Sequence, residues 1–226
     1  MSKTIDMAGL RVFLAMPTHR DLHPQTVASI IGTRELMRER GIPLAIEVAY
    51  GGSLVSHGRA KMAAMFLEGD CNRLFWVDSD MVWDAKDFLK VAALSVHMPI
   101  VAAAYTAKQD PPLFMVRPVL GEVAANEWGC IPMRGLGLGF CCLQREAVET
   151  IAAGAPLRTF HQVDHAIPNP FIHDDDGNGS AEGEDMAFLR RAEEAGIPLW
   201  VDPTIELGHV GTKVYRARLL DHITRV

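Results

Sequence analysis

Short apolar segments alternate with helix-like segments through the first hundred residues, and this alternation constrains the fold more than any other feature. The apolar segments, each short enough for a buried strand, are residues 11–16, 43–50, 74–77 and 100–105. The segments between them place apolar residues at helical spacing or end at a glycine, and they cover 24–41, 59–69 and 85–96. Such alternation is typical of a mostly parallel sheet with helices on both faces. We therefore expect an α/β protein built as an α/β/α sandwich.

The second half of the chain is less regular. Residues 108–134 contain several prolines and little periodicity, which indicates an irregular lobe or a long loop. The sequence GLGLGFCCL at 135–143 predicts one strand, and a short helix is expected over 145–153. The acidic, glycine-rich segment 173–183 predicts a mobile loop, which an amphipathic helix over 184–195 follows.

Composition narrows the classes of function. No linker interrupts the 226 residues, so we expect residues 1–226 to form a single domain. No apolar stretch is long enough to cross a bilayer, and the N-terminus lacks the layout of a signal peptide, which predicts a soluble, cytoplasmic protein. The net charge of −6 argues against nonspecific binding of nucleic acid, although a local basic groove stays open. The four cysteines form no Cys-x-x-Cys pair, so buried reduced thiols are expected rather than a zinc site or disulfides.

Asp78-Ser79-Asp80 is the strongest local signal of function. The tripeptide follows the apolar segment LFWV, at the carboxyl end of a predicted strand, where open α/β sheets bind ligands. Two carboxylates one residue apart can bind a hard divalent cation, which would stabilise a diphosphate leaving group. The structural alternative is that aspartates often begin turns and helices. Asp84 and Asp87 fit that alternative, because they lie at the start of the next predicted helix.

Three more residues could take part in a reaction. Glu184-Asp185 begins a predicted helix, where acidic residues either offset the helix dipole or act as a general base. His209 follows a short predicted strand at 205–207, between glycines that would let the backbone turn tightly. A lone histidine is more often a satisfied polar residue, so we consider it a metal ligand only if it meets Asp80 in space.

Cationic residues near the predicted strand ends could bind phosphate groups. Arg59 and Lys61 begin the second predicted helix, and Lys108 follows the strand that ends at Tyr105. Each of them also fits a solvated surface charge. The glycines of GLGLG do not form Gly-x-Gly-x-x-Gly, and no Walker-type lysine motif is present, so neither phosphate-loop class is supported.

These features together resemble the GT-A class of glycosyltransferases, close to its family 2-like enzymes. The first predicted strand ends in Pro17-Thr18, the segment GRAKMAAMFLEGD precedes LFWVDSDM, and a small-residue strand begins GLGLGFCCLQREAVETI. The final block, GEDMAFLRRAEEAGIPLWVDPTIELGHVG, is similar to the family's Glu-Asp helix, strand and closing histidine. The resemblance spans residues 11–215 and implies a GT-A-like, Rossmann-like sandwich with a mostly parallel central sheet.

The resemblance also implies a role for each candidate residue. A Mn²⁺ or Mg²⁺ ion would be bound by Asp80 and His209, with Asp78 close to the metal or the ribose. Asp185 would be the catalytic base, with Glu184 as the alternative base or an acceptor contact. The nucleotide-sugar would be held by the first strand end, the Asp-x-Asp segment and two cations, namely Pro17, Thr18, Arg59, Asp78, Ser79 and Lys108.

The implied reaction is metal-dependent transfer of a sugar from a nucleoside-diphosphate sugar to an acceptor hydroxyl. A UDP-sugar is favoured and a GDP-sugar is the second donor considered. Tyr50-Gly51-Gly52 lacks the aspartate that often reads the base there, so the choice of nucleotide stays open. Inverting and retaining chemistry both stay open. The acceptor classes are a saccharide, a protein side chain and a hydroxymethylated DNA base, the last of which would suit a phage enzyme acting in its host's cytoplasm. The 173–183 segment would close over donor and acceptor and exclude water.

Two other functions compete with this reading. A nucleotidyltransferase acting on sugar phosphates would also use an α/β fold and acidic metal ligands. Such enzymes usually carry a glycine-rich basic loop after the first strand, whereas this chain has PTHRDLHP. A noncatalytic nucleotide-sugar-binding module would keep the fold without turnover.

Overall fold

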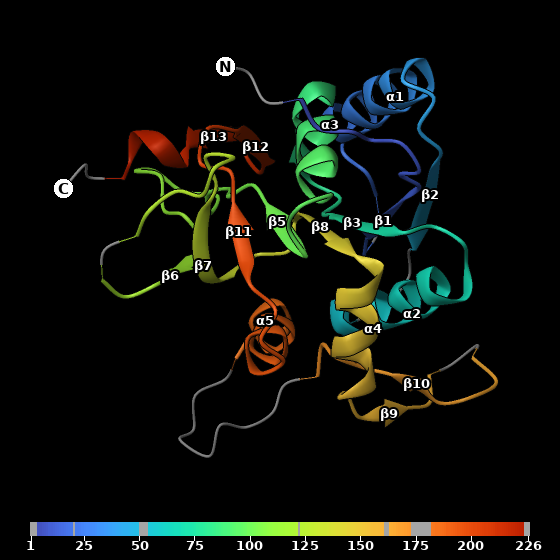
Figure 1. The fold of residues 1–226 in the computed structure, drawn as a ribbon. Coiled ribbons are helices and arrows are strands. Elements are labelled where there is room, and N and C mark those ends of the chain that lie inside the picture. The colour runs from blue at the N-terminus through green and yellow to red at the C-terminus, as the bar shows by residue number, and fades with distance from the viewer. Residues whose placement is uncertain are drawn as a thin grey trace.

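An eight-stranded sheet forms the centre of the protein, in the order β2-β1-β3-β8-β5-β11-β7-β6 (Figure 1). The computed structural model describes residues 4–19, 21–49, 54–121, 123–160, 163–172 and 182–223. The strands of this sheet are β1 (Val12–Pro17), β2 (Leu44–Ala49), β3 (Arg73–Val77), β5 (Ile100–Ala102), β6 (Val116–Pro118), β7 (Ile131–Leu136), β8 (Phe140–Gln144) and β11 (Leu199–Val201). Strands β2, β1 and β3 pair in parallel, as do β5 and β11, whereas β8 and β7 run against their neighbours. The expected α/β fold with a mostly parallel sheet is confirmed, because only these two strands of the sheet are reversed.

The single strand expected at 135–143 is in fact two strands, β7 and β8. Leu136 ends β7 and Phe140 begins β8, so the three residues between them form the connection. β8 is inserted between β3 and β5, while β7 pairs with β11 and β6. The apolar pattern shows no break because Leu138, inside the connection, is itself fully buried. Because this turn is buried and apolar, its hydrophobicity does not distinguish it from the two strands that it joins.

Helices cover both faces of the sheet (Figure 1). α1 (Pro24–Glu39) and α3 (Ala85–Leu94) contribute to one core, while α2 (Val55–Glu68), α4 (Arg145–Ala153) and α5 (Glu184–Glu194) contribute to the other. The Asp84 carboxylate accepts a hydrogen bond from the Lys86 backbone N–H at 2.8 Å, which confirms it as the N-cap of α3. Gly41 and Gly196 follow α1 and α5 with φ of 66° and 72°, a conformation that glycine adopts without steric cost.

Two smaller sheets flank the central one, and the first corrects an expectation about His209. β13 (Val214–Arg218), β12 (Glu206–Val210) and β4 (Met81–Val82) form this sheet, and β9 (Leu157–Arg158) pairs with β10 (Ile167–Pro168) in the second. His209 lies inside β12, opposite Met81, and not in a turn after a strand. Gly208 serves packing rather than turning, since a Cβ there would lie 2.7 Å from Val214 Cγ1. A 3₁₀ helix, Leu219–Asp221, lies near the C-terminal end of the described residues.

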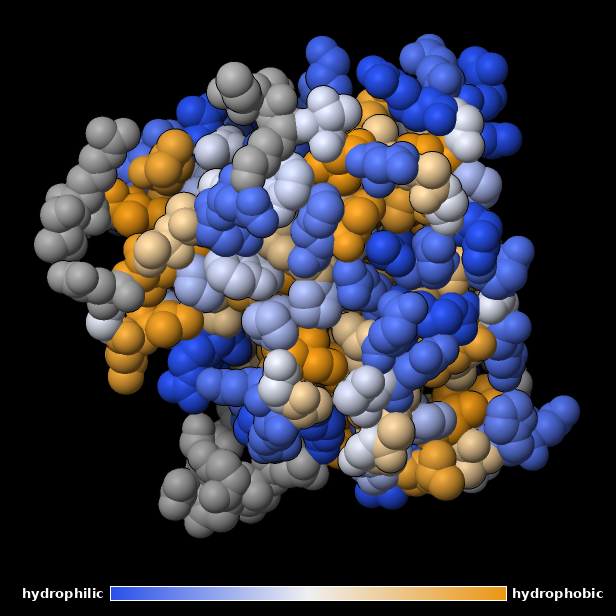
Figure 2. All heavy atoms as spheres, viewed as in Figure 1, coloured by the Kyte–Doolittle hydropathy of each residue, from blue (hydrophilic) through white to orange (hydrophobic). Residues whose placement is uncertain are grey.

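The irregular region expected at 108–134 contains β6 and the first residues of β7. Apolar side chains reach the surface over β6 and the chain beside it, at the left of Figure 2, including Leu113, Met115 and Leu120, of which Leu120 is 84% exposed. Most of the loop expected at 173–183 lies outside the described residues. None of the described helices is both long enough and apolar enough to span a membrane.

Candidate functional site

Three strands bring polar residues to one edge of the central sheet. β1 leads into Thr18, β3 into Asp78, and β5 toward Tyr105. The Thr18 backbone N–H donates to the Ala49 carbonyl at 2.8 Å, and the Asp78 backbone N–H donates to the Gly139 carbonyl at 3.1 Å. These two hydrogen bonds extend the pairing of β1 and of β3 by one residue beyond their carboxyl ends. The polar residues therefore lie at the carboxyl ends of parallel strands, where open α/β sheets bind ligands.

Arg59 is the buried cation at the centre of this edge. Only 1% of its side chain is exposed, so a surface role is excluded. Its Nη2 lies 2.8 Å from Asp78 Oδ1 and 3.3 Å from Asp185 Oδ1, and its guanidinium lies 5.3 Å from the Trp76 ring centre. One guanidinium thus joins the Asp-x-Asp segment to the first turn of α5. Because a buried charge requires a partner, Arg59 fixes both carboxylates in place.

Burial and the neighbouring charges shift the pKa of Asp185. Burial raises the pKa of Asp185 to about 6, against the lowering effect of Arg59 and with further raising by the neighbouring Asp78 and Glu184 carboxylates. Burial acts to lower the pKa of Arg59, but the surrounding carboxylates of Asp185, Asp78 and Glu184 raise it above its ordinary value. A carboxylate with a pKa near neutrality can accept a proton efficiently at physiological pH. Glu184 lies beside it in the same turn, half-buried.

Tyr105 and two glycines complete the wall around Asp78. The Tyr105 hydroxyl lies 3.4 Å from Asp78 Oδ2. A Cβ on Gly139 would lie 2.6 Å from the same oxygen, and one on Gly137 would lie 2.2 Å from the Tyr105 hydroxyl. The glycines of GLGLG therefore allow a close approach of side chains from β3 and β5. Sequence reasoning did not select Tyr105, although its place at the end of an apolar strand was a usable signal.

Asp80 forms a second centre with His209 and Lys108. Asp80 Oδ2 lies 3.4 Å from His209 Nε2 and 2.5 Å from Lys108 Nζ. β12 brings His209 there, because the Val210 backbone N–H donates to the Asp80 carbonyl at 2.8 Å. The structure thus brings His209 to Asp80 across more than a hundred residues of sequence. His209 and Asp80 are therefore in contact, and the role of His209 as a metal ligand stays a prediction.

Hydrogen bonds determine which atoms of this second centre could bind a cation. His209 Nδ1 lies 2.8 Å from the Thr106 carbonyl oxygen, an acceptor, so Nδ1 carries a proton. The other nitrogen, Nε2, faces Asp80: with a proton it donates to the carboxylate, and without one its lone pair can bind a cation. Burial acts to raise the pKa of Asp80, but hydrogen bonds from His209 and Lys108 and their charges bring it down to about 2. Asp80 is therefore a carboxylate at neutral pH. An ionised oxygen and an imidazole nitrogen facing one point are donors that Mn²⁺ accepts.

Asp80 and His209 could supply two of the ligands of a metal ion. Within the residues that the structure describes, no group of three His, Cys, Asp or Glu side chains is arranged to hold a metal ion. An ion at Asp80 and His209 would need its remaining ligands from a bound diphosphate or water. The donor chemistry fits such an ion, whereas a closed structural metal centre does not fit.

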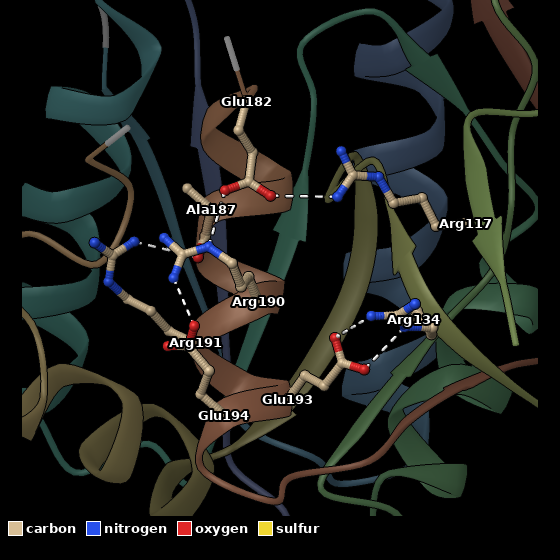
Figure 3. A network of polar contacts seen from close by, with 8 residues as sticks. All are labelled: Arg117, Arg134, Glu182, Ala187, Arg190, Arg191, Glu193 and Glu194. Carbon is tan, nitrogen blue, oxygen red and sulfur yellow. Dashed lines mark hydrogen bonds and ion pairs between the residues drawn. The ribbon is translucent and has the colours of Figure 1, made fainter. Parts of the chain in front are cut away.

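A network of ion pairs fixes the orientation of α5 (Figure 3). Glu182 lies 3.3 Å from Arg117 Nη1 of β6 and 3.0 Å from Arg190 Nε of α5. Farther along the helix, Glu193 lies 2.9 Å from Arg134 Nε of β7. Both ends of α5 are thereby tied to the outer strands of the sheet.

The remaining candidates differ in how near they lie to this cluster. A Cβ on Gly58 would lie 3.6 Å from Pro17 Cβ, so α2 packs closely against the end of β1. Ser79 lies between the two aspartates, and its carbonyl accepts from the His23 backbone N–H at 3.4 Å. Lys61 lines a groove with Met65 and Ile167. Tyr50-Gly51-Gly52 lies outside the described residues.

Comparison with known proteins supports the fold and leaves the family open. No family model matches the sequence, and no curated protein sequence matches it. Among solved structures, A197 from STIV aligns with a TM-score of 0.56 at 20% identity, covering 96% of this chain and 97% of that chain. A structure of GalNAc-T7 with UDP, GalNAc and Mn²⁺ aligns with a TM-score of 0.55 at 11% identity, over 91% of this chain. This chain spans 45% of the length of that GalNAc-T7 chain. The protein therefore has a GT-A-like fold, and its assignment to family 2 stays a prediction.

Proposed function

We propose that this protein is a metal-dependent glycosyltransferase, related to the family 2-like enzymes, which moves a sugar from a nucleoside-diphosphate sugar to an acceptor hydroxyl. The observation that carries the proposal is the placement of two centres on one sheet edge. Asp80 with His209 forms one, and Asp78 with Arg59 and Asp185 forms the other. A donor lying between them would contact a cation site and a proton acceptor together. We propose that a single domain over residues 1–226 carries both.

The donor side is formed by residues at the strand ends. Pro17, Thr18 and Ser79 would line the nucleotide, and Asp78 would accept hydrogen bonds from ribose hydroxyls. Arg59 orients Asp78 through its 2.8 Å contact and is too deeply buried to follow a moving ligand. A UDP-sugar is the favoured donor and a GDP-sugar the second, in keeping with the UDP in the GalNAc-T7 structure.

A divalent cation, Mn²⁺ or Mg²⁺, would be held by Asp80 and His209, where it would neutralise the charge that develops on the departing diphosphate. Thr106 supports this by fixing the His209 tautomer through its carbonyl. Asp80, with its pKa of about 2, supplies a full negative charge throughout the neutral range.

Asp185 is the proposed base of an inverting reaction. Its carboxylate takes the proton from the acceptor hydroxyl as that oxygen bonds to the anomeric carbon and the bond from this carbon to the diphosphate oxygen breaks. With a pKa of about 6, it is mostly ionised at pH 7 and still basic enough to accept the proton. The acceptor would enter beside α5, where Glu184 could contact it. A saccharide, a protein side chain and a modified DNA base remain the acceptor classes to test.

The proposal is tested by screening UDP- and GDP-sugars for binding and for slow hydrolysis in the presence of Mn²⁺. Asp185→Asn serves as the matched variant, because it removes the proton acceptor while keeping the side-chain shape. We expect it to bind the donor and to lose turnover. Binding without turnover in both proteins would favour a noncatalytic module, and synthesis of a nucleotide-sugar from a nucleoside triphosphate and a sugar phosphate would favour a nucleotidyltransferase. If no nucleotide-sugar bound with or without Mn²⁺, the proposal would fail.

A further inference from the structure

Lys108 lies where a bound cation would compete with it. Its Nζ is 2.5 Å from Asp80 Oδ2, the same oxygen that faces His209 Nε2. We propose that Lys108 is a built-in counterion of the metal site, which a divalent ion must displace and which then moves to the donor diphosphate. This inference rests on the proposed function. It adds the expectation that the metal ion and the nucleotide-sugar donor bind cooperatively.

The charges at the sheet edge support an exchange of cations. Among the described residues, the carboxylates of Asp78, Asp80, Glu184 and Asp185 gather there, and the positively charged groups that act on them include Arg59 and Lys108. Arg59 is 1% exposed and enclosed, so it cannot leave. Lys108 is 39% exposed, so its side chain is free to move. Its departure would leave negative charge that a divalent ion at Asp80 neutralises.

The surroundings of Lys108 permit this movement. A Cβ on Gly211 would lie 3.1 Å from Lys108 Cδ, so the glycine leaves room for the lysine stem to lie across the β12–β13 turn. Lysine is a flexible point charge that pairs readily with phosphate. A diphosphate bound at the metal would offer Lys108 a new anion within reach of the same stem. Binding of the donor would therefore release Asp80 for the metal.

Exchange of this kind makes a quantitative prediction about coupling. Because linkage is reciprocal, a donor that draws Lys108 away tightens metal binding, and the metal tightens donor binding by the same factor. Without Lys108 the metal ion no longer competes with a lysine for Asp80, so the coupling between metal binding and donor binding decreases. For a partly exposed ion pair, we expect Mn²⁺ to bind the donor-free protein about fivefold more tightly after Lys108→Met.

The test is a titration of Mn²⁺ followed by electron paramagnetic resonance, with and without UDP, on the full chain and two variants. Lys108→Met removes the competing charge, and Lys213→Met is the matched control, since Lys213 is a neighbouring lysine that pairs with Asp110 instead. We expect Lys108→Met to tighten Mn²⁺ binding without UDP and to reduce the additional tightening by UDP. Lys213→Met should change neither by more than about twofold.

Two results would overturn the inference, and they are distinguishable. If Lys108→Met bound Mn²⁺ no more tightly than the unmodified protein, Lys108 would not compete with the metal, while the proposed transferase function would stand. If the unmodified protein bound no Mn²⁺ even with UDP, both the exchange and the metal dependence of the proposed function would be wrong. Lys108→Gln repeats the test with a polar side chain, which guards against a local packing effect of methionine.

Discussion

Replacing Asp185 with asparagine is predicted to stabilise the protein while it abolishes turnover. Burial raises the pKa of this carboxyl from 3.8 to about 6, even with Arg59 beside it. Between those two values the folded state binds more protons than the unfolded state, so the free energy of unfolding falls as pH rises through this window. Each pKa unit is worth about 1.4 kcal/mol, which gives an upper limit of about 3 kcal/mol above pH 6. Since the side chain is 20% exposed, we expect a gain of about 2 kcal/mol for Asp185→Asn at pH 8.

The pH dependence of that gain is the decisive part of the measurement. Urea unfolding of both proteins at pH 8 and pH 4 should show the gain at pH 8 and less than about 1 kcal/mol of it at pH 4, where the folded carboxyl is protonated. Turnover should fall by about 10²- to 10⁴-fold. Glu193→Gln is the control on the same helix, because its exposed pair with Arg134 contributes less than about 1 kcal/mol. An Asp185→Asn protein no more stable than the parent at pH 8 would refute the reasoning.

Three further substitutions test the packing of the site and the local interpretation of the sequence. Gly139→Ala places a Cβ 2.6 Å from Asp78 Oδ2, so it should lower the free energy of unfolding by about 1–3 kcal/mol and weaken donor binding. Gly32 lies within α1, and a Cβ there would have its nearest neighbour at 3.8 Å. Gly32→Ala should therefore be neutral or stabilising by about 0.5–1 kcal/mol in the same urea titration. Asp84→Ala removes the N-cap of α3 and should lower the unfolding free energy by about 1 kcal/mol, with no loss of donor binding in calorimetry.

Much of the fold could be predicted because its signals are local. Gly41 and Gly196 mark helix ends by a conformation that other residues avoid, and Asp84 caps α3 through a bond to a residue two positions away. The two reversed strands, β7 and β8, could not be separated, since the connection that contains Leu138 is as apolar as the strands. Strand order depends on contacts far apart in the chain, so apolar periodicity does not encode it.

The residues of the candidate site also differ in whether local sequence signals could predict them. Asp78 and Asp80 were selected because they follow a strand, which is a local fact. The burial of Arg59 was not foreseen, since an arginine near the start of a helix is usually solvated and only Trp76 and two distant carboxylates make it a core residue. The resemblance suggested His209, but its position inside β12 depends on pairing with β4. Lys108 was expected at a phosphate, and its contact with Asp80 emerged only from the structure.

The most direct test of the account is Mn²⁺-dependent hydrolysis of a UDP-sugar by the unmodified protein and by Asp80→Asn. The account predicts slow release of free sugar that needs Mn²⁺ and falls by at least about tenfold in the variant, because Asp80 and His209 would share the ion. Equal hydrolysis with a chelator present, or in Asp80→Asn, would contradict a metal site at this sheet edge.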